Sequence, residues 1–74
     1  MEKIRTAVIG VGSLGQHHAR ILASHPLSQL IGVVDSDSRR GEKIAKAHGT
    51  TPYAAYADII GKIDAAVVAV PTPF

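Results

Sequence analysis

The stretch that decides the fold reads Gly10-Val11-Gly12-Ser13-Leu14-Gly15. These residues fit the pattern G-x-G-x-x-G, in which the first glycine allows a tight turn and the second lets a pyrophosphate approach the backbone. The third glycine lets the following helix pack closely against the preceding strand. The pattern predicts nucleotide binding only where a strand precedes it and a helix follows it. The flanking residues therefore decide what the glycines mean.

The flanks of the glycine motif fit a strand and a helix. The run Ile4–Gly10 contains Ala7-Val8-Ile9, which is typical of a strand buried on both faces. A helix is expected over residues 13–24, because the residue before Pro26 avoids the helical region. Its apolar residues recur at helical spacing: Leu14, Ile21 and Leu22. An anion at the turn would meet free backbone N–H groups and the positive end of the helix dipole.

The remainder of the chain continues the alternation of strands and helices. Leu30–Val34 is continuously apolar and predicts a second buried strand. Cap-type residues at 36–39 precede a second helix, which closes at His48-Gly49 because glycine suits the left-handed C-terminal position. The later elements are expected to be an edge strand at Thr51-Pro52-Tyr53, a short helix over Tyr56–Ile60 and a last buried strand over Ala65–Val70. The order βαβαβαβ over residues 1–74 predicts one α/β domain with parallel strands and right-handed crossovers.

Asp35 is a second, independent signal for a dinucleotide. It follows the second strand and lies 35 − 15 = 20 residues beyond Gly15, where a carboxylate can accept both hydroxyls of the adenosine ribose. A carboxylate there disfavours a 2′-phosphate, so NAD is predicted in preference to NADP. Arg39 and Arg40 lie close enough to weaken this preference for NAD, by meeting a phosphate or stacking on adenine. Their alternative interpretation is a solvated first turn of the second helix.

Composition excludes several classes of function. Eight basic and six acidic residues give a net charge of +2, and the scattered basic residues predict no nucleic-acid partner. No apolar stretch reaches the roughly 20 residues of a membrane helix, and the N-terminus lacks signal-peptide architecture, so no membrane partner is expected. The chain has no cysteine, which excludes disulfides and thiolate metal sites and is compatible with a cytoplasmic location.

Catalytic and metal-binding residues are not expected in this chain. The adjacent His17 and His18 point about 100° apart on a helix, and His25 and His48 fall at helix ends, so no ligand spacing exists. No Ser/His/Asp triad, acidic pair or thiol nucleophile is present.

The motifs together resemble the Gfo/Idh/MocA oxidoreductases, the family of glucose–fructose oxidoreductase and inositol dehydrogenase. The glycine motif followed by His18-Ala19-Arg20 resembles the first turn and helix of that family. Asp35-Ser36-Asp37 with Arg40 and Ala45 resembles its D-x-D-x-x-R-x-x-x-x-A stretch, and Asp64–Pro73 resembles the strand beside the nicotinamide ring. The resemblance covers nearly the whole chain.

The resemblance implies a partial Rossmann fold with sheet order 3-2-1-4 and a set of cofactor contacts. With Gly15 and Ser36, which belong to the same motifs, the candidate cofactor-binding residues are Gly10, Val11, Gly12, Ser13, Leu14, Gly15, Asp35, Ser36, Arg40, Val70, Pro71 and Thr72. The family's Glu-Lys-Pro lysine, its downstream His or Asp and its substrate domain would all lie beyond Phe74. The chain by itself is therefore expected to bind NAD without dehydrogenase activity.

Three functions fit these expectations. The first is the NAD(P)-binding part of an oxidoreductase that acts on a sugar, a polyol or a related CH–OH substrate. The second is a non-catalytic module that binds NAD for a partner protein, and the third is a CoA-type ligand on the same turn, which Asp35 disfavours. The apolar strand 65–70 would be an exposed edge, so self-association through it, or a missing C-terminal half that covers it, is expected.

Overall fold

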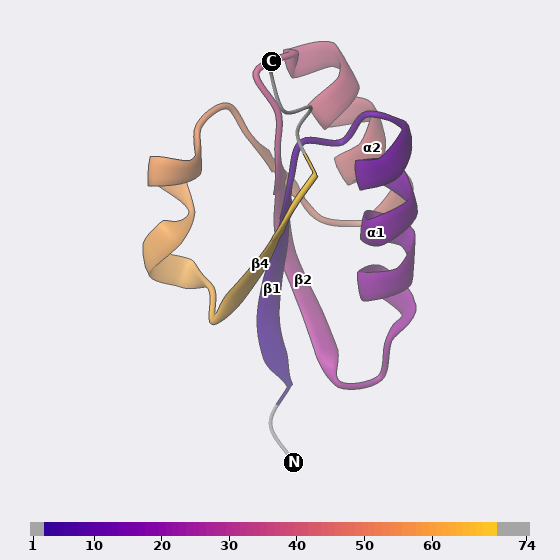
Figure 1. Cartoon of the computed structure of the whole chain (residues 1–74), viewed down its shortest axis with the longest axis vertical. Helices are drawn as coiled ribbons and strands as arrows, with labels where there is room; N and C mark the ends of the chain where they lie inside the picture. The colour runs from indigo at the N-terminus through magenta and orange to yellow at the C-terminus, as the bar shows by residue number, and fades with distance from the viewer. Residues whose placement is uncertain (1–2, 70–74) are drawn as a thin grey trace.

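The computed structural model describes residues 3–69, which form a four-stranded parallel sheet. Its order is β3-β2-β1-β4, with strands β1 (Ile4–Ile9), β2 (Ser28–Val34), β3 (Thr51–Tyr53) and β4 (Ala65–Val68). Helices α1 (Ser13–Ser24) and α2 (Ser38–His48) lie on one face, and two 3₁₀ turns lie on the other (Figure 1). The predicted α/β class, the parallel pairing and the order 3-2-1-4 are confirmed.

Strand β1 is central because it pairs on both sides. Val8 lies opposite Val33 of β2 and Val67 of β4. The register with β2 shifts between Thr6 and Ala7, so that one residue of β2 is passed over. Just before the shift the Thr6 and Ser28 hydroxyls, both buried, lie 2.9 Å apart in a hydrogen bond. The start of the strand pair is therefore polar but satisfied.

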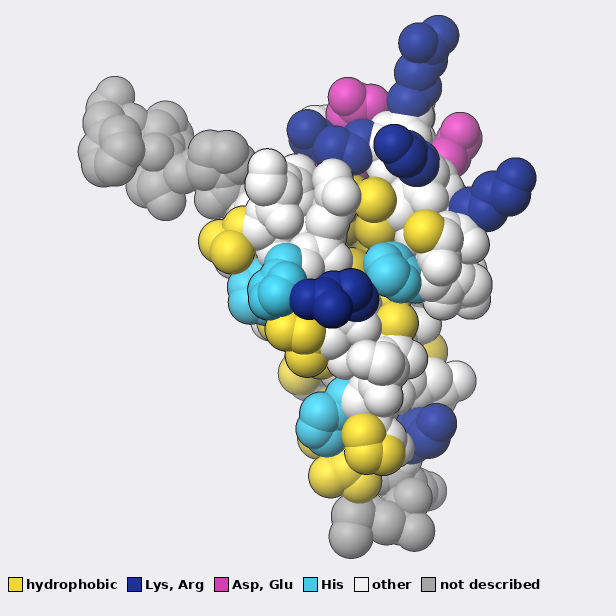
Figure 2. Space-filling model, turned by 90° about the vertical axis from the view of Figure 1, so that its right-hand side faces the viewer, with side chains coloured by type: hydrophobic (Ala, Val, Ile, Leu, Met, Phe, Trp, Pro, Cys, Tyr) yellow, Lys and Arg dark blue, Asp and Glu magenta, His cyan; other side chains and the backbone are white. Residues whose placement is uncertain are grey.

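Helix α1 packs on the sheet through small residues. Gly15 and Ala19 are its buried residues, and Leu22 packs against the core beside them. Leu14 and Ile21, which the sequence pattern grouped with Leu22, are exposed instead. The close approach of α1 to β1 at Gly15 sets which side of the helix faces the sheet, and Leu14 and Ile21 lie outside that side. Figure 2 views the helical side of the molecule, where hydrophobic side chains stand among basic and histidine side chains.

Helix α2 has the ends that its sequence predicts. The Asp37 carboxylate at its N-cap accepts a hydrogen bond from the Arg40 N–H at 3.1 Å. Gly49 at its C-cap is left-handed with φ of 66°. Its apolar residues complete the core between the helices and the sheet, which consists of Val8, Val11, Ala19, Val33, Ile44 and Ala45.

The opposite face is covered more thinly, and here one prediction is wrong. Residues 56–60 form no α-helix but parts of two 3₁₀ turns, η1 (Tyr56–Asp58) and η2 (Ile60–Lys62). An apolar pattern of five residues does not distinguish an α-helix from successive 3₁₀ turns. Between the turns Ile59 is fully buried and packs with Ala7 and Val34. A Cβ on Gly32 would lie within 2.8 Å of the Tyr53 ring and the terminal methyl of Ile59, so a larger residue there would force these side chains to shift.

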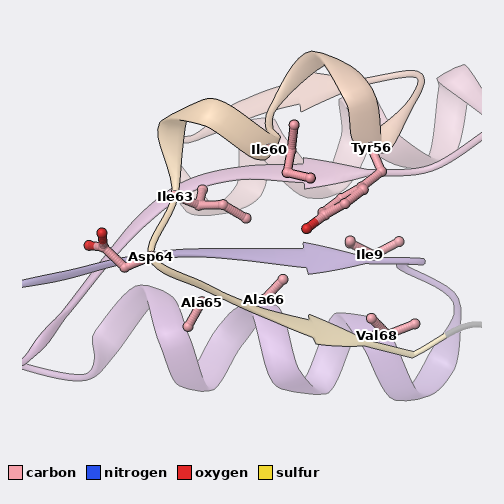
Figure 3. A pocket seen from close by; sticks show the side chains of 8 residues that line it. All are labelled: Ile9, Tyr56, Ile60, Ile63, Asp64, Ala65, Ala66 and Val68. Carbon is pink, nitrogen blue, oxygen red and sulfur yellow. The ribbon is translucent and has the colours of Figure 1, made fainter.

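Strand β4 was predicted to be a buried strand, yet most of its described residues are exposed. It is the edge of the sheet in the described part of the chain, and its edge carries no charged residue and no proline. Beside it lies a groove of about 710 Å³ between β4, β1 and the 3₁₀ turns (Figure 3). This surface, called the β4 groove below, is lined by Ile9, Tyr56, Ile60, Ile63, Asp64, Ala65, Ala66 and Val68.

An ion pair holds the start of β4 to β1. One Asp64 carboxylate oxygen accepts hydrogen bonds from the backbone N–H of Arg5 at 2.9 Å and from its Nε at 3.2 Å. The other oxygen accepts from Arg5 Nη2 at 2.9 Å. These contacts lower the pKa of the exposed Asp64 carboxyl. The pair fixes the amino end of β4, which ends at Val68. The predicted strand extended to Val70, which lies outside the described residues.

Candidate functional site

The glycine turn has the geometry that its pattern predicts. Gly10 has a positive φ of 87°, and its N–H donates to the Val34 carbonyl at 2.7 Å. A Cβ on Gly15 would collide with the carbonyl of Gly10, so helix and strand can approach this closely only with glycine at position 15. A Cβ on Gly12, by contrast, would meet no atom within 4 Å. The first and third glycines are thus required by the fold, while the second borders open space.

Helix α1 begins at this turn without a capping side chain. Gly12 is its N-cap, no side chain bonds to the first turn, and no acidic residue lies in that turn. The first N–H groups of a helix have no partner within it, and they carry the positive end of its dipole. The turn therefore offers donors and a favourable potential to an anion.

The turn opens into a cleft of about 770 Å³ at the carboxyl ends of β1, β2 and β4. Strands β2 and β3 are added on one side of β1, and β4 is added on its other side. Ligands bind in open α/β sheets at such a switch in strand order, here between β1 and β4. A volume of this size is in the usual range for a small-molecule site. The cleft is lined by Ile9, Gly10, Gly12, Ser13, Leu14, Val34, Asp35, Ser36, Arg40, Val68 and Ala69.

Most of the predicted site residues meet in this cleft. Val11 and Gly15 are buried behind the turn rather than on its surface. Val70, Pro71 and Thr72 lie outside the described residues. The sequence analysis missed four apolar lining residues, which are Ile9, Val34, Val68 and Ala69. Their common signal is position, because three of them are the last residue of a strand and Ala69 follows the fourth strand.

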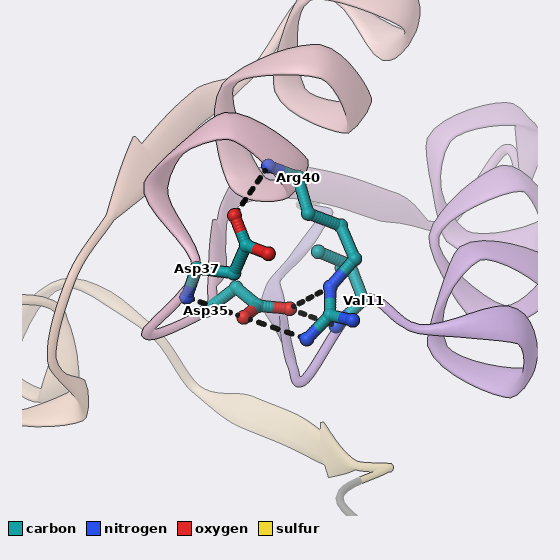
Figure 4. Close-up of polar contacts among 4 residues, drawn as sticks. All are labelled: Val11, Asp35, Asp37 and Arg40. Carbon is teal, nitrogen blue, oxygen red and sulfur yellow. Dashed lines mark hydrogen bonds and ion pairs between the residues drawn. The ribbon is translucent and has the colours of Figure 1, made fainter.

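Asp35 is held at the back of the cleft by four hydrogen bonds (Figure 4). Its Oδ2 accepts from the Val11 N–H at 3.0 Å and from Arg40 Nε at 2.8 Å. Its Oδ1 accepts from the Asp37 N–H at 2.8 Å and from Arg40 Nη2 at 3.0 Å. The hydrogen bond from Arg40 is the largest cause that lowers the pKa of Asp35 to about 2, against the opposing effect of its burial. Asp35 is therefore a carboxylate at neutral pH.

The two arginines of the second helix have different positions. Arg40 lines the cleft and pairs with Asp35, which raises the pKa of its guanidinium. Arg39 is exposed and is not among the lining residues. The sequence placed both arginines near the adenosine, and of the two only Arg40 lines the cleft. Its contact with a phosphate or with adenine stays a prediction.

The histidine side chains outside the cleft form no metal site in the described part of the chain. His17 Nδ1 lies 3.0 Å from Arg20 Nη2 on the surface of α1. Among residues 3–69 no group of three or more His, Cys, Asp or Glu side chains could hold a metal ion. No helix in that range is long and apolar enough to cross a membrane.

The parallel order β3-β2-β1-β4 with a glycine turn at the switch point defines a Rossmann-type nucleotide-binding fold. Comparison with known families is more specific. Residues 4–74 match the Gfo/Idh/MocA family, described as an oxidoreductase family with an NAD-binding Rossmann fold. The chain belongs to this family.

Individual relatives agree with the family. The chain is 35% identical over 72 residues to the UDP-N-acetylglucosamine 3-dehydrogenase of Acidithiobacillus ferrooxidans, covering 97% of this chain and 22% of that protein. A crystal form of that enzyme superposes with a TM-score of 0.88. The myo-inositol 2-dehydrogenase of Lactobacillus plantarum gives a TM-score of 0.86 at 36% identity, covering 99% of this chain and 23% of that one. The structure of GenD2 from gentamicin A biosynthesis, in complex with NAD, gives a TM-score of 0.90 at 32% identity, covering 96% of this chain and 21% of that one. The chain thus spans about a fifth of the length of these relatives.

Proposed function

We propose that this chain forms the adenosine- and pyrophosphate-binding half of the NAD site of a cytoplasmic oxidoreductase that acts on a sugar, a polyol or a related CH–OH group. One observation carries the proposal: the glycine turn, the uncapped start of α1 and the Asp35 carboxylate line the same cleft. Relatives named as sugar and inositol dehydrogenases support the substrate class.

Different residues of the cleft bind different parts of the dinucleotide. The backbone at Gly12, Ser13 and Leu14 receives the pyrophosphate, because it borders open space at the positive end of α1. Asp35 and Ser36 face the adenosine ribose at the end of β2. The family resemblance assigns Val70, Pro71 and Thr72, which lie outside the described residues, to the nicotinamide side. When bound, NAD supplies the hydride-accepting ring, and this chain's residues hold and orient it.

Gly12→Val is the sharpest test, because its side chain would enter the open space of the cleft without straining the backbone, where φ is −67°. Calorimetric titration with NAD should show saturable binding to the wild type and at least a tenfold weaker affinity for this variant. Gly61→Val is the matched control, because Gly61 also borders open space but lies on η2 away from the cleft. Equal affinities of both variants would contradict the proposed site.

The chain on its own is proposed to hold the cofactor without catalysing hydride transfer. Among the described residues that line the cleft, the ionisable ones are Asp35 and Arg40, and they form an ion pair with each other. A general acid or base needs a group that can exchange a proton near neutral pH. Purified chain mixed with NAD and a panel of sugars and inositols should therefore form no NADH above background. Measurable NADH formation would contradict this part of the proposal.

The β4 edge and the β4 groove are proposed to bind a second copy of this chain. The other edge of the sheet, β3, contains Pro52, which blocks strand addition, whereas β4 has no such protection. Two copies of β4 can pair antiparallel about a twofold axis, and no charged residue within Ala65–Val68 opposes the contact. The pairing would also bring two apolar grooves together.

Sedimentation velocity over a range of concentrations tests this association. The wild type should shift towards a dimer as concentration rises, and Ile60→Lys, in the β4 groove, should remain a monomer. Leu27→Lys is the control, because Leu27 is 45% exposed, close to the 54% of Ile60, but lies outside the groove. A wild type that sediments as a monomer at all concentrations would contradict the proposal.

A further inference from the structure

Ile9 and Val68 line both the dinucleotide cleft and the β4 groove. They are neighbours in the sheet, because Ile9 at the end of β1 pairs with Val68 at the end of β4. Side chains of directly paired residues point to the same face of a sheet, and Figure 3 shows both at the carboxyl end of the groove. The Ile9–Val68 pair is therefore a wall that the two cavities share.

Ala69, the residue after this pair, connects the wall to the glycine turn. Its N–H donates to the Ile9 carbonyl at 2.8 Å, which ties the end of β4 to the residue before Gly10. Ala69 also borders the start of α1, because a Cβ on Gly15 would come to 3.6 Å from the Ala69 Cβ. The end of β4 thus contacts the groove on one side and the proposed pyrophosphate-binding turn on the other.

The two ends of β4 are held differently. The ion pair between Arg5 and Asp64 fastens its amino end at 2.9 Å. At its carboxyl end the Val68 side chain is 65% exposed, and β4 is an edge of the sheet in the described part of the chain. The outer backbone groups of an edge strand are open to pairing with another strand. A second copy that pairs with β4 would bond to these groups, cover Val68 and fix the position of the strand end.

We infer that NAD binding in the cleft and self-association through β4 strengthen each other, and that the shared wall of Ile9 and Val68 couples them. The inference rests on the proposed NAD site and on the proposed pairing of β4. A strand end that a second copy already holds loses less conformational freedom when NAD binds against it, so NAD binds the dimer more tightly than the monomer. Because such coupling is reciprocal, NAD favours the dimer in turn.

Sedimentation velocity of the full chain, with and without saturating NAD, tests this coupling. If NAD binds each site of the dimer about threefold more tightly than the monomer, saturating NAD should tighten the dimer dissociation constant about tenfold, since the two sites multiply. The reciprocal effect is measured by calorimetry on Ile60→Lys, whose substitution lies in the groove but outside the cleft. This monomeric variant should bind NAD about threefold more weakly than the wild-type dimer.

Val68→Ala tests the route of the coupling, because it shortens the shared wall at an exposed position. In this variant NAD should tighten the dimer by less than about twofold. The ratio of dimer constants with and without NAD cancels any direct effect of the substitution on either binding event. Leu27→Ala is the matched control, because it truncates an exposed aliphatic side chain that lines neither the cleft nor the groove, and it should keep the wild-type ratio.

The possible failures are distinguishable. A dimer dissociation constant that NAD leaves unchanged or weakens would overturn the coupling and leave both binding sites in place. An undiminished effect of NAD in Val68→Ala would overturn the assignment of the coupling to the shared wall. A wild type that binds NAD but sediments as a monomer at all concentrations would overturn the self-association and the inference with it. A wild type that dimerises without binding NAD would overturn the proposed NAD site instead.

Discussion

The sheet carries an aspartate–arginine pair at each of the two ends of its parallel strands. These ends are called the carboxyl edge and the amino edge below, and the pairs differ in what surrounds them. At the carboxyl edge Asp35 is 3% exposed, accepts two backbone N–H groups and faces a cleft. At the amino edge Asp64 is 46% exposed, and its partner Arg5 is 49% exposed. Both pairs are 2.8–2.9 Å long. Length alone therefore does not separate a pair that organises a site from one that fastens a strand, whereas burial of the carboxylate does.

The largest difference between the edges is expected at the glycine turn. Gly15→Ala forces a Cβ into the Gly10 carbonyl, and the turn supports the Val11 N–H on Asp35, so the carboxyl edge should lose its structure. We expect a loss of about 3 kcal/mol or more in the free energy of unfolding. Gly61→Ala should change it by less than about 0.5 kcal/mol, since its Cβ meets nothing. Urea unfolding of both variants measures this, and similar values would break the comparison.

Removing each carboxylate gives the next largest effect. Asp35→Ala leaves two backbone N–H groups without their acceptor, one of them on the buried Val11, and should cost about 2 kcal/mol. Asp64→Ala removes an exposed pair, which solvent screens, and should cost clearly less than Asp35→Ala. The free energies of unfolding of the two variants, measured in the same buffer, show which carboxylate contributes more to stability. A larger loss at Asp64 would reverse the ranking.

A smaller effect is expected when acid protonates Asp35 and removes the stability that its pair with Arg40 contributes. The folded pKa of Asp35 is about 2, below its ordinary value of 3.8, so its extra stability is complete above pH 3.8 and is lost as pH falls towards 2. The stability difference between the wild type and Arg40→Met should favour the wild type at pH 6 and be small, because Arg40 is exposed. It should shrink between pH 4 and pH 2. Unfolding curves over this range that show a constant difference would contradict the assignment to Asp35.

The sequence predicted the features that depend on local backbone requirements. Gly10 and Gly49 have the positive φ that their turns demand, and Asp35 directly follows its strand as the sequence pattern indicated. The strand order came from the family resemblance rather than from composition or periodicity, and it too is confirmed.

The features that the sequence missed depend on contacts between distant segments. Leu14 and Leu22 share a helical pattern, but only the approach of α1 to β1 decides that Leu14 is exposed. The lack of space for a side chain at position 32 arises from Tyr53 and Ile59, which lie 53 − 32 = 21 and 59 − 32 = 27 residues further along the chain. Likewise the hold of Arg40 on Asp35 depends on which of many rotamers a long side chain adopts. Periodicity and spacing carry no information on these choices.

The central claim is that the carboxyl edge of this sheet is a working dinucleotide half-site. Its most direct test follows backbone amide signals of isotopically labelled chain by NMR during titration with NAD. The account predicts saturable shifts concentrated at Gly12, Ser13, Leu14 and the residues around Asp35, with the amides around Asp64 unmoved. Shifts that are absent at saturating NAD, or that centre on the β4 groove, would contradict it.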